Sequence, residues 1–347
     1  MTTGARPRRI AVDAMGGDHA PEAPVLAALA VSRSTDIEVL LCGDEASIGE
    51  VLGRTGPPGG GLRVIHAPTR IAAEEDPRRA LERRDSSLAR ALQAVATGEA
   101  EGLVSAGNTG ALVLLAATRL GRLPGVARVA LGAVYPTRPR PHNPDPFALI
   151  VDAGANLSCR PEHLVEFAAL GSAYARVVSR VDRPTVGLLN VGEEPEKGDA
   201  LLREAHRLLR AEPSLAFAGN VEGRHVPLGA VDVVVCPGIL GNVVLKLLES
   251  VGELVLGLGE EVFRQRPAWR LGQRLLAGGL RRLSRVMDYR SYGGAPVLGL
   301  ERVVIKAHGR SSSHALENAI KLAAKAVRDD LIGATSCALA AIRRGQP

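Results

Sequence analysis

The chain is poor in aromatic residues and cysteine, and it has no apolar run of the roughly 18 residues that a bilayer span needs. Aromatic side chains make up 3% of its 347 residues, so few can stack on nucleic acid bases, although the net charge is +6. The four cysteines lie far apart and form no CxxC pair, which disfavours a zinc site or a dithiol redox site. We therefore expect no metal, no cofactor and no nucleic acid partner.

Apolar residues are nevertheless plentiful. They make up 46% of the chain, and the mean hydropathy is +0.08, which is enough to build a sizeable core. The first residues are basic, but the apolar segment of a signal peptide does not follow them, which favours a cytoplasmic protein. The length allows two domains or one large α/β domain. We expect a single domain over residues 1–347.

Short, nearly continuous apolar runs alternate with helical patterns. Stretches such as ALIVDAG and VDVVVCPG are typical of strands buried on both faces of a parallel sheet. Strands are predicted at residues 9–14, 38–42, 62–66, 102–105, 129–134, 147–152, 185–190, 215–218, 231–236 and 303–307. Helical patterns lie between most of them, for example at 86–97, 161–178 and 199–209. This alternation predicts a three-layer α/β/α fold with a mostly parallel sheet.

Glycine beside asparagine, serine or threonine follows most of these strands. Open sheets bind ligands at the carboxyl ends of their strands, where glycine permits close backbone approach and helix N-termini attract anions. The loops are SAGNTGAL (105–112), DAGANLS (152–158), NVGEEPEKG (190–198), AGNVEG (218–223), PGILGN (237–242) and KAHGRSS (306–312). One such loop would be an ordinary capped turn. Their repetition at successive strand ends indicates an anion site.

Lysine is scarce, since only five of the 43 basic residues are lysines. Lys197 and Lys306 lie inside two of the loops, and Lys246 follows Asn242 by one helical turn. The chain contains no P-loop, no GxGxxG after its first strand and no GxSxG elbow. These observations predict a cleft that binds an oxyanion and has no evident covalent nucleophile.

A series of motifs resembles, in order, those of the bacterial phosphate acyltransferases of phospholipid synthesis. They are VDAMGGDHAP, SAGNTGAL, VDAGAN, GLLNVGEEPEKG, GNVEG, DVVV followed by GN, YGGAPVLG and IKAHGRSS. The resemblance implies the fold of isocitrate and isopropylmalate dehydrogenases and of phosphotransacetylases, and a homodimer. It also implies transfer of a fatty acyl group from acyl carrier protein to inorganic phosphate. A membrane-embedded glycerol-3-phosphate acyltransferase would consume the acyl phosphate.

Direct attack of phosphate on the thioester requires positioning, charge neutralisation and oxyanion stabilisation. The candidate catalytic residues are Lys197, His308, Lys306 and Asn190. The candidate phosphate-binding residues are Ser105, Gly107, Asn108, Thr109, Gly110, Ser311, Ser312 and Asn242. The candidate scaffold of the cleft consists of Asp13, Gly16, Gly17, Asp18, Asn156 and Asn220.

One motif departs from the family pattern. The family usually has Asp-Gly-Phe before its Gly-Asn, whereas this chain has Pro237, Gly238, Ile239 and Leu240 there. If the missing carboxylate is a base, Asp232 could replace it, or the chain could be a weakened paralogue that still docks carrier protein or membrane. A coenzyme A-dependent phosphotransacetylase is the enzyme alternative. A decarboxylating dehydrogenase would need clustered aspartates for a metal, which we do not find.

Residues 263–287 contain seven arginines and no acidic residue. On a helical wheel one side carries Arg270, Arg274, Arg281 and Arg285, and the other carries Leu275, Leu276, Leu280, Leu283, Val286 and Met287. This pattern predicts an amphipathic basic helix within a protruding segment, 249–290. A membrane surface, the acidic carrier protein or the dimer partner would each fit it.

Overall fold

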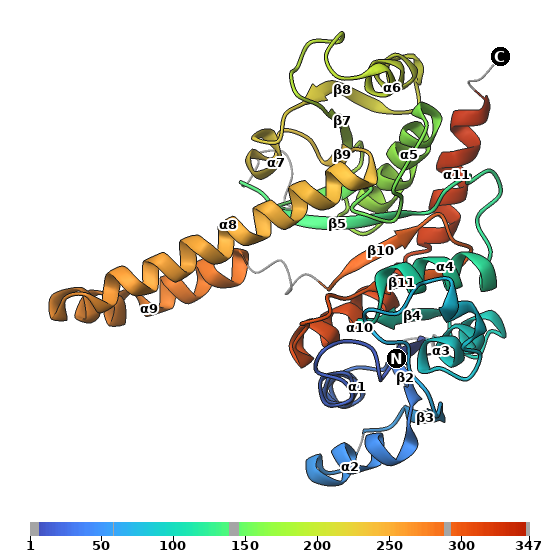
Figure 1. Ribbon diagram of the computed structural model, residues 1–347, viewed down its shortest axis with the longest axis vertical. Coiled ribbons are helices and arrows are strands. Elements are labelled where there is room, and N and C mark those ends of the chain that lie inside the picture. Colours follow the sequence, from blue (N-terminus) through green and yellow to red (C-terminus); the bar gives the residue numbers. More distant parts are fainter. Residues whose placement is uncertain (1–6, 58, 139–145, 288–292, 345–347) are drawn as a thin grey trace, which may run out of the picture.

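A computed structural model describes residues 7–57, 59–138, 146–287 and 293–344. The strands form one sheet with helices on both faces (Figure 1), which confirms the predicted α/β/α class. The strands are β1 (Arg9–Asp13), β2 (Glu38–Gly43), β3 (Leu62–His66), β4 (Gly102–Ser105), β5 (Ala130–Pro136), β6 (Phe147–Val151), β7 (Thr185–Leu189), β8 (Ala216–Val221), β9 (Val233–Val235), β10 (Ala295–Leu298) and β11 (Val303–Lys306).

The helices follow most of these strands, as the sequence predicts. They are α1 (Glu22–Ser34), α2 (Glu45–Thr55), α3 (Ser87–Ala96), α4 (Thr109–Arg119), α5 (Pro161–Val177), α6 (Ala200–Ala211), α7 (His225–Leu228), α8 (Gly238–Arg264), α9 (Pro267–Met287), α10 (Ser313–Arg328) and α11 (Leu331–Arg344). A 3-10 turn covers Arg79–Glu82. Strand β10 was not predicted, because it is short, contains Pro296 and lies between glycines.

The sheet consists of two parallel halves that run in opposite directions. Its strand order is β3-β2-β1-β4-β11-β10-β5-β6-β9-β7-β8, and the pairs that involve β10, as well as the β5–β6 pair, are antiparallel. The sequence led us to expect all six glycine loops along one edge of the sheet. That expectation is wrong, because the two halves run in opposite directions. The loops at 105–112 and 306–312 belong to one half, and the other four belong to the second half.

The register nevertheless brings the carboxyl ends of the two halves close together. Lys306, at the end of β11, pairs with Ala295 of β10, and Val297 of β10 pairs with Leu131 of β5. Val151, at the end of β6, pairs with the next residue of β5, Gly132. Strands β11 and β6 thus end within about one residue of the same level. The loops that follow them begin beside β5 and β10.

Helices cover both faces and enclose two main apolar clusters. On one face α1, α5, α10 and α11 pack on the sheet, with Phe167 of α5 fully buried. On the other face α3 and α4 cover the first half. Helix α7 and the first turns of α8 pack on the second half through Val226, Leu240 and Val244. Apolar packing thus extends over both halves of the sheet, on either side of β5 and β10.

Helices α8 and α9 run side by side and project away from the rest of the chain (Figure 1). The predicted basic helix corresponds to α9, although it begins at Pro267, and the helical pair begins at Gly238. Leu275 is 79% exposed, and Arg270 and Arg274 are exposed as well. Arg281, Leu283 and Arg285 lie in α9, but their side chains are outside the described set. None of the helices in the described part of the chain has the length and apolar character to cross a bilayer.

Candidate active site

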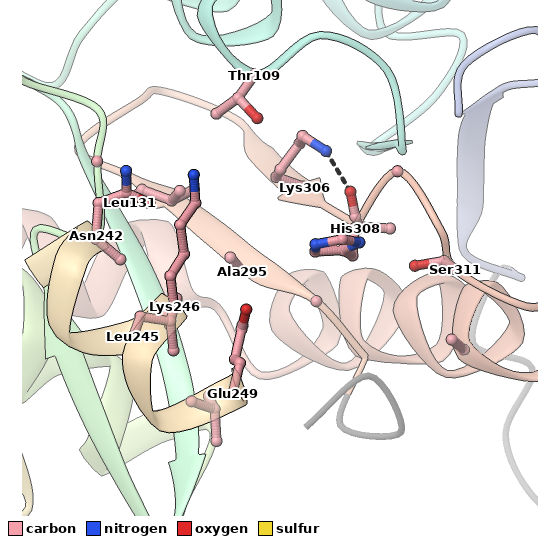
Figure 2. Close-up of a pocket in the computed structure, with 18 residues that line it drawn as sticks. Thr109, Leu131, Asn242, Leu245, Lys246, Glu249, Ala295, Lys306, His308 and Ser311 are labelled. Carbon is pink, nitrogen blue, oxygen red and sulfur yellow. Dashed lines mark hydrogen bonds between the residues drawn. The ribbon is translucent and has the colours of Figure 1, made fainter. Parts of the chain in front are cut away.

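A cavity of about 450 Å³ lies where the two halves of the sheet meet (Figure 2). Strands β5 and β10 contribute Leu131, Ala133, Val134 and Ala295 to its wall. The first half contributes the polar residues Thr109, Lys306, His308 and Ser311, and α8 of the second half contributes Asn242, Lys246 and Glu249. Five predicted site residues therefore line one space: Thr109, Lys306, His308, Ser311 and Asn242.

Lys306 is the most buried cation of this cavity, with 8% of its surface exposed. Its Nζ donates hydrogen bonds to the backbone oxygens of Ala106, at 3.3 Å, and Ala307. Burial lowers the pKa of the ammonium to about 8, against the opposing effect of the Asp13 and Asp18 carboxylates. The lysine is thus still mainly protonated at pH 7, and it places a positive charge in a largely desolvated wall.

Asp13 and Ser105 hold the loop after β4 in place beneath this lysine. The Ser105 hydroxyl donates to Asp13 Oδ2 at 2.7 Å and accepts a bond from the Gly107 amide at 3.1 Å. Burial raises the pKa of the Asp13 carboxyl, while hydrogen bonds from serine hydroxyls act against that shift. A Cβ on Gly16 would lie 2.8 Å from the Gly107 nitrogen, so glycine is required where these two loops touch. Asp13, Ser105 and Gly16 thus position the loop backbone.

Asn108 caps α4 and fixes a neighbouring loop. Its Oδ1 accepts a bond from the Ala111 amide at 3.0 Å, and its Nδ2 donates to the oxygens of Ala73 and Glu75, both at 2.9 Å. Ser312 caps α10 in the same way, accepting a bond from Ala315. Asn108 and Ser312 thus form hydrogen bonds to the protein itself. In the loop after β4, it is the side chain of Thr109 that faces the cavity (Figure 2).

The loop after β7 forms a second group of predicted residues, which is not part of this cavity wall. Asn190 donates to the oxygen of Lys197 at 3.0 Å, and Asn220 donates to the oxygen of Glu194 at 2.7 Å. Both asparagines therefore shape the 190–198 loop. A catalytic role of Lys197 remains a prediction, and the structure places this lysine on a folded loop of the second half.

Asp152 organises the second half of the site, although it is not among the site residues predicted from the sequence. Its Oδ1 accepts bonds from the amides of Leu131 and Ala155, both at 2.9 Å. Its Oδ2 accepts bonds from the Asn156 amide and from Asn156 Nδ2, both at 2.8 Å. A Cβ on Gly241 would lie 2.0 Å from the Asp152 backbone oxygen, so the first turn of α8 packs directly on this loop. That contact sets the position of Asn242.

Pro237 precedes the first residue of α8, so no carboxylate stands at the position where the family usually has Asp. Asp232 lies before β9, at the opposite end of that strand, and accepts bonds from the amide and the hydroxyl of Thr185. The expectation that Asp232 could replace the carboxylate is therefore wrong. Glu249 lines the cavity instead. The spacing of Asn242, Lys246 and Glu249 along α8 is the signal that could have revealed it.

Among the described residues, no three His, Cys, Asp or Glu side chains are arranged to hold a metal ion.

The scaffold residues Gly17 and Asp18 lie beside the two loops of the first half. The Asp18 amide donates to the Gly309 oxygen at 2.8 Å, and a Cβ on Gly17 would lie 2.9 Å from Ala106. This end of the cavity is thus built from three loops in contact.

The fold is that of the phosphotransacetylases, a class of α/β/α protein. A phosphotransacetylase from Streptococcus pyogenes matches 93% of this chain and 95% of its own, with a TM-score of 0.63 at 17% identity. The corresponding structure from Staphylococcus aureus matches 92% and 94%, with a TM-score of 0.59 at 16% identity. At these identities the likeness concerns the fold alone.

The chain belongs to the fatty acid synthesis protein family, whose profile matches residues 8–333. The phosphate acyltransferase of Myxococcus xanthus is 46% identical over 316 residues, which cover 90% of this chain and 88% of the relative. That of Synechocystis is 40% identical over 319 residues, covering 92% and 90%. The predicted family is confirmed, and the protein is an acyltransferase that acts in phosphate acyl transfer.

Proposed function

We propose that this acyltransferase moves a fatty acyl group from acyl carrier protein to inorganic phosphate. One observation carries the proposal. Cationic and polar groups from both halves of the sheet, Lys306, His308 and Lys246 among them, face one cavity together with the carboxylate of Glu249, and the remaining wall is apolar. The polar part suits a phosphate anion, and the apolar part suits the first carbons of an acyl chain. Both reactants of the proposed transfer thus find a matching surface in one space.

The reaction needs no covalent intermediate with the enzyme. A phosphate oxygen attacks the thioester carbonyl carbon, a C–O bond forms, and the C–S bond breaks with its electron pair leaving on the thiolate. Lys306 neutralises phosphate at the N-terminus of α4, where free amides also favour an anion. His308 lines the same cavity, and in this proposal it takes the proton of the attacking phosphate. Asn242 faces this pair from α8 (Figure 2) and would donate to the developing oxyanion.

The test is a phosphate-dependent assay of thiol release with a set of donors. We expect turnover with long-chain acyl carrier protein and little with acetyl coenzyme A. His308→Gln should lower kcat about 100-fold, whereas His314→Gln, a matched change on the exposed part of α10, should not. A preference for acetyl coenzyme A would favour a short-chain phosphotransacetylase. Absence of even a single turnover would favour the weakened paralogue.

Lys197 is proposed as a further phosphate-binding residue on the 190–198 loop. Lys197→Ala should raise the KM for phosphate sharply and leave the KM for the acyl donor unchanged. Lys321→Ala, on the outer face of α10 where the lysine pairs with Glu317, is the matched control. An unchanged phosphate dependence in Lys197→Ala would remove that lysine from the site.

We also propose that the protein is a cytoplasmic homodimer that touches the membrane, where a glycerol-3-phosphate acyltransferase uses its product. Helix α8 supports pairing, because exposed apolar side chains recur along it: Ile239, Val243, Leu247, Leu254, Leu258 and Val262. Helix α9 supports membrane contact through Leu275 and its arginines.

Two substitutions test these proposals. Light scattering of Leu254→Glu, which places a charge on the apolar face of α8, should report a monomer. Leu275→Glu should lose binding to anionic vesicles that Leu228→Glu, a matched exposed leucine on α7, retains.

A further inference from the structure

A second cavity, of about 270 Å³, adjoins the first. Thr109 and Gly154 line both of them, so the two spaces meet at the N-terminus of α4. The second one follows the side of α4 between that helix and the loop after β6. We call it the α4 groove and define it by Thr109, Val113, Ala117, Arg122, Arg128 and Gly154. Gly110 and Asn156, candidate phosphate-binding and scaffold residues, also line this space, whereas Val113, Ala117, Arg122 and Arg128 have no role in the proposed chemistry.

The α4 groove is elongated, and its middle is apolar. Thr109, Val113 and Ala117 are spaced four residues apart, so they lie on one face of α4. From Thr109 to Ala117 the helix rises about 12 Å. The side chains of Val113 and Ala117 are half-buried and form a neutral floor. A ligand that fits this space is long and narrow, with an uncharged middle part.

The end of the groove away from Thr109 has two arginines and, beside them, the carboxylate of Glu166, which accepts a hydrogen bond from the Ala127 amide at 3.0 Å. Arg122 and Arg128 are both exposed there, and Arg122 is held by a hydrogen bond to the oxygen of Ala127. Arg119 lies nearby at the end of α4, where burial and the charge of Arg84 lower its pKa. Guanidinium groups bind the oxygens of a phosphate or phosphodiester with paired, charge-assisted hydrogen bonds. The groove thus joins an anion-binding end to the cavity where the acyl group reacts.

We infer that the α4 groove binds the phosphopantetheine arm of the acyl donor. The phosphodiester of the arm would lie on Arg122 and Arg128, its amide chain along Val113 and Ala117, and its thioester at Thr109. This assignment rests on the proposed function. It differs from docking of the donor on the arginines of α9, because those lie on the projecting helices and not on a space that opens into the cavity.

The experiment compares two small donors that differ in one phosphate, S-palmitoyl-phosphopantetheine and S-palmitoyl-pantetheine. In Arg122→Gln/Arg128→Gln we expect the KM for the phosphorylated donor, and for acyl carrier protein, to rise tenfold or more, by about the strength of a charged hydrogen bond. The KM for the donor without phosphate and the kcat should not change. Arg207→Gln/Arg210→Gln, an exposed arginine pair on α6, is the matched control and should behave as wild type.

A second variant tests the middle of the groove. Ala117→Trp should raise the KM for both small donors and leave the KM for phosphate unchanged, while circular dichroism reports that the chain is folded. Equal effects of the double arginine change on both small donors, or a larger effect of the α6 control, would overturn the assignment. If the wild type transfers no acyl group from any donor to phosphate, the proposed function itself fails. If the wild type is active and the arginine variant is unchanged, only the groove assignment fails.

Discussion

The kcat/KM for phosphate should fall as the pH rises, because Lys306 loses its positive charge. Its ammonium is buried in the cavity wall, and its pKa is about 8. The fraction protonated then drops from roughly 90% at pH 7 to roughly 10% at pH 9. If the charged form binds phosphate, kcat/KM for phosphate should fall about ninefold over this range. The kcat/KM should decrease on the alkaline side of the pH profile, because the Lys306 ammonium loses its charge as the pH rises through its pKa.

The assay is kcat/KM for phosphate from pH 6.5 to 9.5 in wild type, Lys306→Gln and Lys321→Gln. The ionisation of phosphate itself is common to all three and cancels in their ratios. Lys306→Gln should be about 100-fold less active, as for loss of one preorganised donor, and should lack the inflection near pH 8. Lys321→Gln should keep it. An inflection of the same size in Lys306→Gln would refute the assignment to this lysine.

The same lysine gives a readout that does not depend on activity. Its pKa is lower in the folded protein than the ordinary value of 10.5, so the unfolded chain binds more protons between about pH 8 and 10.5. The free energy of unfolding of the wild type should therefore rise relative to Lys306→Gln over this window, by at most about 1.4 kcal/mol per pH unit. Urea unfolding at pH 8 and pH 10 measures it. A difference that falls with pH would contradict the lowered pKa.

Three further changes test the architecture around the site by urea unfolding. Ser105→Ala should cost about 1–3 kcal/mol, because it removes a donor from the buried Asp13 carboxylate; a neutral result would show that this hydrogen bond contributes nothing. Gly241→Ala should cost about 1–3 kcal/mol or more, since its Cβ would overlap a backbone oxygen, whereas Gly257→Ala in the same helix, which meets open space, should not destabilise. Equal effects of the two changes would contradict the packing of α8 on the loop after β6. Phe167→Ala should cost about 3–5 kcal/mol with activity retained per folded molecule, because it empties a fully buried position that does not line the cavity.

The alternation of apolar runs and helical patterns was sufficient to predict the fold class and most strands to within two residues. Runs such as the one at 147–151 are buried along nearly their whole length, so they carry a strong local signal. Strand β10 was missed because four residues that include a proline carry almost none. Three successive antiparallel pairs, β11–β10, β10–β5 and β5–β6, reverse the direction between the halves of the sheet, so the relative orientation of the two loop groups could not be read locally.

The sequence by itself determined which residue types stand at the strand ends, and hence that Thr109, Lys306, His308, Ser311 and Asn242 were candidates. Only the tertiary structure decided which of them share a space. The reason is that contacts between the halves depend on strand register and helix packing over long sequence separations. Asp152 became visible only through the five hydrogen bonds that its carboxylate accepts, and the α4 groove only through the neighbouring loop that closes its side.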